Sequence, residues 1–288
     1  MKSRGYATGV ATTGGSVGGI IFPLIFQAAV PRFGFGWAVR TIGFVALVFL
    51  TFGNLLIRGR PTPESASIAS IKTGATKVRG AKIDLKAFKS LKFSLTTAGV
   101  FLIEWGLFVP LTYITSYAIH LGMPEAFSYQ LLVIMNVGSV FGRWLPGLVA
   151  DRIGRFNTMC LTVTLCFLCT VGLWLPSNYV TGMVGRKTIL IVFALFYGFG
   201  SGSGISLTPV CVGQICDVKE YGTKFGTCYF FVSFGTLTGI PIAGEIVTRM
   251  DGAYTGLVAF TACSYVGALM FFAAARIVGA GSKLKTVY

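Results

Sequence analysis

Charged residues are scarce in this sequence, and acidic residues are the scarcest of them. Only 11% of the 288 residues are charged, with nine Asp or Glu and one His, whereas 54% are hydrophobic and the mean hydropathy is +0.76. Soluble domains carry about 25% charged residues. A single core of a chain of this length cannot bury so much apolar surface, so lipid must cover part of it. The composition therefore excludes a soluble domain and predicts an integral membrane protein.

Patterns for catalysis and for metal binding are also missing. With a single His there is no histidine cluster, and we find no nucleophile beside a general base. Seven cysteines lie within or at the ends of apolar segments; Cys166 and Cys169 have CxxC spacing but lack a second Cys or His pair at metal spacing. We predict packing thiols, no disulfide framework, no metal, no cofactor and no enzyme activity.

The net charge of +15 would suggest a nucleic-acid partner in a soluble protein. Here the Lys and Arg residues fall in short segments between apolar runs, which is typical of the positive-inside rule. We therefore expect the bilayer and a small-molecule substrate as partners, and no nucleic acid.

Apolar runs long enough to cross a bilayer predict an all-α, polytopic membrane helix bundle. The eight candidate spans are 6–30, 37–57, 93–119, 127–150, 157–176, 188–212, 224–248 and 254–278. The connection 58–92 is the long one; with nine Lys or Arg it predicts a hydrophilic linker that ends in a surface helix around 85–91.

These runs divide the chain into four expected parts. They are a two-helix part at 1–57, the basic linker at 58–92, a six-helix part at 93–278 and a tail at 279–288. With the first terminus and the linker placed inside, eighteen Lys or Arg lie inside against five outside. This asymmetry predicts that both termini are cytoplasmic. We take the plasma membrane as the expected location, with the vacuolar membrane as the alternative.

One short loop, GLVADRIGRFN at 147–157, concentrates charge and glycine between two apolar runs. Asp151 is suited to accept hydrogen bonds from an arginine or from the N–H groups of a neighbouring helix end, which would latch helix ends together. The pattern G-x-x-x-D-R-x-G-R resembles the cytoplasmic signature of the major facilitator superfamily, which lies between helices 2 and 3 and, in weaker form, between helices 8 and 9. The matching residues are Gly147, Asp151, Arg152, Gly154 and Arg155.

Within that superfamily the chain resembles the fungal monocarboxylate-porter-like branch. The stretches that carry the resemblance are RGYATGVATTGGSVGGIIFPL, FGWAVRTIGF, GLFVPLTYITSYA, NVGSVFGRWLPGLVADRIGRFN and FGTCYFFVSFGTLTGIPIAGEI. The resemblance implies helices 5–12 of a twelve-helix fold, in a fragment that lacks helices 1–4.

The resemblance implies a secondary active transporter of small organic anions, the monocarboxylates, which works by alternating access; proton coupling, as in a symporter, is left open. Two alternatives stay open. One is a larger substrate, either a vitamin such as riboflavin or an exported secondary metabolite. The other is a fragment that inserts into the membrane but does not transport.

Two ionisable residues inside predicted spans are the candidates for substrate binding, because charge at membrane depth is costly. Arg143 is suited to bind a carboxylate by a two-point contact, the alternative being an arginine that reaches the interface or braces helix ends. Glu104 is the candidate proton carrier or partner of Arg143. The resembling porters place an aspartate one turn before the arginine, where this chain has Ser139. The predicted binding set is Arg143, Glu104, Ser139, Asn136 and Ser203.

Small residues mark the expected close contacts between helices. The predicted packing glycines are Gly14, Gly18, Gly200 and Gly204. The span 188–212 is expected to be a flexible, closely packed gating helix that breaks near Pro209. Its serines, Ser201, Ser203 and Ser206, are candidates to face a cavity.

Overall fold

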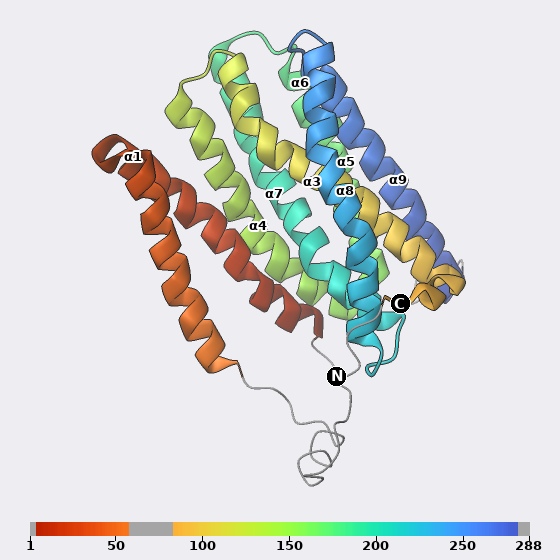
Figure 1. The fold of residues 1–288 in the computed structure, drawn as a ribbon. Helices are drawn as coiled ribbons and strands as arrows, with labels where there is room; N and C mark the ends of the chain where they lie inside the picture. Colours follow the sequence, from red (N-terminus) through yellow and green to blue (C-terminus); the bar gives the residue numbers. More distant parts are fainter. Residues whose placement is uncertain (1–3, 58–82, 282–288) are drawn as a thin grey trace. The chain divides into compact units, whose positions relative to one another are not determined.

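A computed structural model describes residues 4–57 and 83–281, and within these ranges all the regular secondary structure is helical and there is no strand (Figure 1). Packing divides the chain into two compact units. The first contains residues 4–20 together with 83–281, and the second contains residues 21–57. Residues 58–82 of the predicted basic linker and residues 282–288 of the predicted tail lie outside the described residues.

The first unit is a bundle of long helices that begins with residues 4–20 of α1 (Arg4–Leu56). Its α4 packs on α7, α3 packs on both α8 and α9, and α5 packs on α7 and α9 (Figure 1). The remaining elements are η1 (Leu85–Lys89), α3 (Leu91–His120), α4 (Glu125–Ile153), α5 (Arg155–Cys169), a π-helical turn η2 (Thr170–Trp174), α6 (Leu175–Ser177), α7 (Met183–Gln214), α8 (Tyr221–Arg249) and α9 (Thr255–Ala280).

In the second unit, residues 21–56 continue α1 through a kink at Gly34, whose backbone is not helical. Its φ of 75° lies in the left-handed region that glycine adopts at little cost. The predicted spans 6–30 and 37–57 thus both fall in α1, on either side of this kink. Near this kink, the rings of Phe26 and Phe35 pack edge to face, with their centroids 5.8 Å apart.

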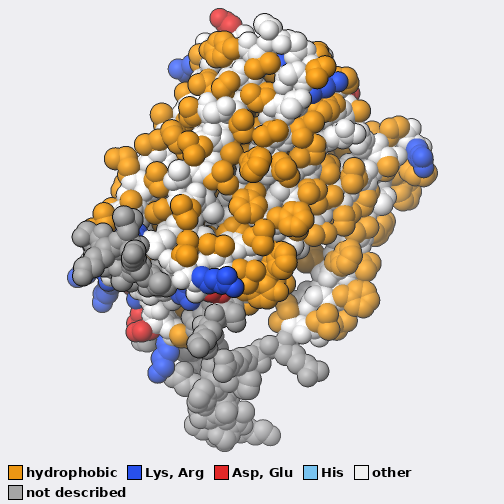
Figure 2. Space-filling model, turned by 180° about the vertical axis from the view of Figure 1, so that it is seen from behind, with side chains coloured by type: hydrophobic (Ala, Val, Ile, Leu, Met, Phe, Trp, Pro, Cys, Tyr) orange, Lys and Arg blue, Asp and Glu red, His pale blue; other side chains and the backbone are white. Residues whose placement is uncertain are grey.

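Within the described ranges, seven helices are long and apolar enough to cross a membrane, and α1 with its kink counts once among them. Hydrophobic side chains cover most of the face shown in Figure 2, while charged side chains gather near its upper and lower ends. The predicted all-α membrane bundle is therefore confirmed.

Glycines on both helices bring the backbones of α4 and α7 into close contact. A Cβ placed on Gly142 would collide with the backbone of Phe199, and one on Gly202 would lie 2.6 Å from the carbonyl oxygen of Ser139. Gly138 and Gly198 complete the same arrangement, with four-residue spacing on each helix.

The two predicted packing glycines of α7 face other neighbours. A Cβ on Gly200 would lie 2.6 Å from the thiol of Cys166 on α5. One on Gly204 would make only ordinary contact with Ile103 and Leu107 of α3, at 3.4 and 3.5 Å. Gly200 is therefore required by packing, whereas Gly204 leaves room for a methyl group.

The predicted break near Pro209 is wrong, since α7 runs without interruption to Gln214. Proline removes the hydrogen bond to the carbonyl of Ile205, but neighbouring helices in a membrane bundle tolerate such a loss. The serines before it are buried and do not line the open cavity described below. Ser203, for example, donates its hydroxyl to the carbonyls of Gly142 (2.9 Å) and Phe199 (3.0 Å).

Candidate functional site

Asp151 lies in the last turn of α4 and holds the first turn of α1. Its carboxylate accepts hydrogen bonds from the backbone N–H groups of Gly5 and Tyr6, both at 3.3 Å. The backbones touch beside this contact, because a Cβ on Gly5 would lie 2.7 Å from the carbonyl oxygen of Gly147. A carboxylate at a helix amino terminus satisfies free N–H groups and complements the helix dipole. The contact expected of Asp151 is therefore present.

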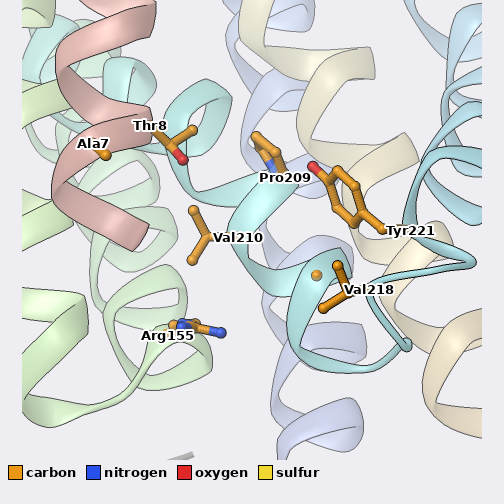
Figure 3. A pocket seen from close by; sticks show the side chains of 8 residues that line it. Ala7, Thr8, Arg155, Pro209, Val210, Val218 and Tyr221 are labelled. Atoms are coloured by element: carbon orange, nitrogen blue, oxygen red, sulfur yellow. The ribbon is translucent and has the colours of Figure 1, made fainter. Parts of the chain in front are cut away.

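The rest of the charged loop turns the chain from α4 into α5. Gly154 has a φ of 101°, so the turn uses backbone freedom that other residues lack. Arg152 is exposed, in the last turn of α4, where a cation favours the helix dipole. Arg155 is half-buried and lines a small pocket of about 280 Å³ (Figure 3). The other lining residues are Ala7, Thr8, Pro209, Val210, Gly213, Val218 and Tyr221.

Arg143 belongs to a polar seam, defined here as the row Asn136, Ser139 and Arg143 on α4 where it faces residues 12–19 of α1. The Arg143 guanidinium donates through Nη1 to the carbonyl oxygen of Thr12 and through Nε to Ser139 Oγ at 3.4 Å. Ser139 Oγ in turn shares a hydrogen bond of 2.9 Å with Ser16 Oγ. The arginine is thus engaged with the chain's own backbone and hydroxyls.

Glycines let α1 approach the polar seam, but they are not the predicted pair, Gly14 and Gly18. A Cβ on Gly15 would lie 2.9 Å from Arg143 Nη1, and one on Gly19 would collide with the Asn136 amide. In contrast, Gly14 is exposed and meets no described atom within 4 Å, so its predicted packing role is not found; Gly18 is half-buried. A Cβ on Gly9 would collide with the backbone carbonyl of Arg143, so the glycines of α1 that show contact with α4 are Gly5, Gly9, Gly15 and Gly19.

Glu104 lies elsewhere, in the wall of an open cavity between α3, α7 and α8. The glutamate is 6% exposed and the cavity has a volume of about 840 Å³. Arg143 is not among its lining residues, and among the described residues Glu104 has no ion pair. The predicted pairing of Glu104 with Arg143 is therefore absent from the described structure, because the two side chains serve different helix interfaces.

The cavity wall is mainly apolar and contains few polar groups. Besides Glu104, its polar members are Tyr229, Ser233 and Thr236 of α8. The apolar members are Phe108, Ile205, Leu237, Ile240 and Pro241. This arrangement can hold an apolar molecule and offer it hydrogen-bond acceptors, and none of the described residues in the wall is basic.

The sequence analysis missed these α8 residues, although the sequence contains a signal for them. Positions 229, 233, 236 and 240 follow one another at spacings of three and four, which places them on one helix face. Three of the four, Tyr229, Ser233 and Thr236, are polar. Of the predicted binding set, Glu104 alone is among the described residues that line this cavity. Three others, Asn136, Ser139 and Arg143, lie together in the polar seam. The fifth, Ser203, lies on α7 where it contacts α4.

Comparison with known proteins agrees with this architecture. Residues 1–186 match the family described as Major Facilitator Superfamily. The chain is 34% identical over 278 residues to an MFS-type transporter of Gibberella moniliformis, covering 96% of this chain and 62% of that protein. It is 38% identical over 262 residues to the riboflavin transporter MCH5 of Saccharomyces cerevisiae, covering 86% and 49%. It is 33% identical over 291 residues to the agnestins efflux protein AgnL12 of Paecilomyces divaricatus, covering 99% and 60%.

The chain spans about three fifths of the length of the first of these relatives and about half of the yeast protein. The family match covers more than half of this chain, and seven of the described helices are long and apolar enough to cross a membrane. The chain is therefore an integral membrane protein that belongs to the Major Facilitator Superfamily.

Proposed function

We propose that this chain carries the substrate cavity of a secondary transporter for small molecules that works by alternating access. The observation that supports it is the open cavity between α3, α7 and α8, whose volume of about 840 Å³ is within the range of ligand pockets, roughly 300–1,000 Å³. A mostly apolar wall with a few polar groups is also typical of such pockets.

The substrate that fits this wall best is an apolar, neutral molecule with hydrogen-bond donors. Glu104 and the hydroxyls of Tyr229, Ser233 and Thr236 offer acceptors, and the lining contributed by residues 4–57 and 83–281 contains no Lys or Arg. A carboxylate substrate would meet the acid and no cation there. The guanidinium required for a monocarboxylate, that of Arg143, is bonded to Thr12 and Ser139 in the polar seam.

The names of the relatives support this choice, since one is a riboflavin transporter and another an efflux protein for agnestins. We therefore favour a vitamin or secondary-metabolite substrate over a monocarboxylate. Glu104 is the proposed proton-coupling residue, because an ionisable group at membrane depth is costly unless it has a function. The proposed topology keeps both termini, the basic linker and the Asp151 loop in the cytoplasm.

Filling the cavity tests the proposal. Ser233 is exposed to the cavity, so Ser233→Trp fills part of it without displacing buried core; Thr238→Trp puts the same ring on an exposed position of α8 outside the lining. In proteoliposomes, with neutral fluorescent anthracene-9-carboxamide as the probe, we expect Ser233→Trp to lower the flux at least tenfold and Thr238→Trp to leave it within twofold. Equal fluxes in both variants, or parent vesicles that carry benzoate but not the carboxamide, would contradict the proposal.

A further inference from the structure

Two hollows lie along the same pair of helices, α7 and α8. On α7, Ile205 lines the open cavity and Pro209, one turn further on, lines the small pocket. On α8, Tyr229 lines the cavity and Tyr221, two turns earlier, lines the pocket. Eight residues of helix separate the two tyrosines by about 12 Å, so the hollows are close neighbours along the bundle.

A row of three aromatic rings spans this separation. Tyr221, Phe225 and Tyr229 follow one another at four-residue spacing, so they share a face of α8. The rings of Tyr221 and Phe225 are stacked, with centroids 5.5 Å apart and planes inclined by 22°. The rings of Phe225 and Tyr229 have centroids 4.7 Å apart and planes inclined by 47°. Phe225 thus lies between a ring that lines one hollow and a ring that lines the other.

The α7 side of this row is kept close by a glycine. A Cβ on Gly213 would lie 3.3 Å from the Tyr221 ring, so any larger residue there would press on the ring. Figure 3 shows Tyr221 and Val218 on one side of the pocket and Ala7 and Thr8 of α1 on the other. The half-buried Arg155 adds a guanidinium at this end, a group that interacts favourably with aromatic faces.

We propose that Tyr221, Phe225 and Tyr229 form an aromatic track between the cavity and the pocket, that Phe225 is its narrow point, and that the substrate is a planar aromatic molecule. This inference rests on the proposed function and specifies its substrate class. A planar aromatic molecule that moves along the track contacts the next ring before it leaves the previous one, so it keeps a stacking interaction throughout. A saturated molecule of equal size cannot stack on these rings, so no stacking interaction stabilises it as it passes Phe225.

Thiol labelling tests the narrow point without requiring transport. In vesicles of the full chain, Ser233→Cys places a thiol in the cavity, and native Cys216, in the loop between α7 and α8, reports which membrane side a charged reagent reaches. Peptide mass spectrometry reads each site separately. With reagent on the Cys216 side, Phe225→Ala is expected to speed modification of residue 233 about tenfold, Phe225→Leu to speed it less, and Phe225→Trp to slow it. Phe230→Ala, on an exposed α8 position outside both linings, is the matched control and leaves the rate unchanged.

The same labelling tests the substrate class. Anthracene-9-carboxamide added on the Cys216 side is expected to protect residue 233 at least fivefold better than its fully hydrogenated analogue, and Phe225→Leu to abolish this difference. Equal protection by the two probes would overturn the aromatic track. A reactive thiol at 233 whose rate ignores residue 225 would overturn the narrow point and leave the cavity intact. A thiol that is unreactive in every variant would overturn both this inference and the proposed function.

Discussion

The guanidinium of Arg143 and the carboxylate of Glu104 illustrate how differently the bundle uses two costly side chains. Arg143 reaches across to the carbonyl of Thr12 and bonds Ser139, so its charge serves the contact between α4 and α1. Glu104 has no such partner among the described residues and lines an open cavity. In the sequence alone, both are ionisable residues within apolar spans. Only the packing of the helices distinguishes their roles.

Glycines in the α1–α4 contact give a direct test of this packing. Gly9→Ala is expected to lower the free energy of unfolding by about 1–3 kcal/mol, because the new methyl group collides with the Arg143 backbone, which cannot rotate away. Gly14→Ala is the matched control on the same helix. Its methyl group meets no described atom within 4 Å, and alanine favours a helix by about 0.5–1 kcal/mol over glycine. Thermal unfolding of the detergent-purified variants should therefore place Gly9→Ala below the parent and Gly14→Ala at or above it; a Gly9→Ala variant as stable as the parent would refute the contact.

The long helices are the elements that sequence predicts best, because an apolar run of about 20 residues in a chain this poor in charge has few alternatives to a spanning helix. The boundaries of α3 to α9 lie near the predicted spans. For the course of the helices, the prediction that was wrong is the break near Pro209, whose lost hydrogen bond neighbouring helices tolerate. Side-chain roles were harder: serines of α7 are buried between helices, and only the three- and four-residue spacing of Tyr229, Ser233 and Thr236 indicated a cavity face.

At the level of the element, the Asp151 contact should control the first turn of α1. Removing the carboxylate with Asp151→Ala leaves the N–H groups of Gly5 and Tyr6 without their acceptor, so local opening there becomes easier. Hydrogen exchange of residues 5–9 is expected to accelerate about tenfold. Arg152→Ala alters the neighbouring, exposed charge and should leave exchange in that turn unchanged. If both variants exchange like the parent, Asp151 does not hold this helix end.

At the scale of the whole molecule, the charge asymmetry predicts which end of the bundle faces the cytoplasm, and native Cys216 reports it. Burial raises the pKa of this thiol, with Glu220 and Asp217 raising it further and Lys224 lowering it. Since the thiolate is the reactive form, labelling by a charged maleimide should be slow near neutrality and rise as pH increases toward that raised pKa. We expect labelling from the cytoplasmic side alone.

The control for this topology is a thiol at the other end of the bundle. Tyr179 is 72% exposed in the connection that precedes α7, so Tyr179→Cys should react from the external side alone. Reaction of Cys216 from the external side, or of both thiols from the same side, would reverse the proposed orientation.

The central claim is that substrate lies in the cavity of α3, α7 and α8 and not at the polar seam. Photo-crosslinking measures this most directly: a diazirine derivative of anthracene-9-carboxamide is bound to the full chain in lipid nanodiscs, irradiated and located by peptide mass spectrometry. We predict adducts around Glu104, around Ile205 and between Tyr229 and Pro241, and their loss in Ser233→Trp. Adducts concentrated on residues 136–143 of α4, unaffected by that substitution, would contradict the claim and return the substrate to Arg143.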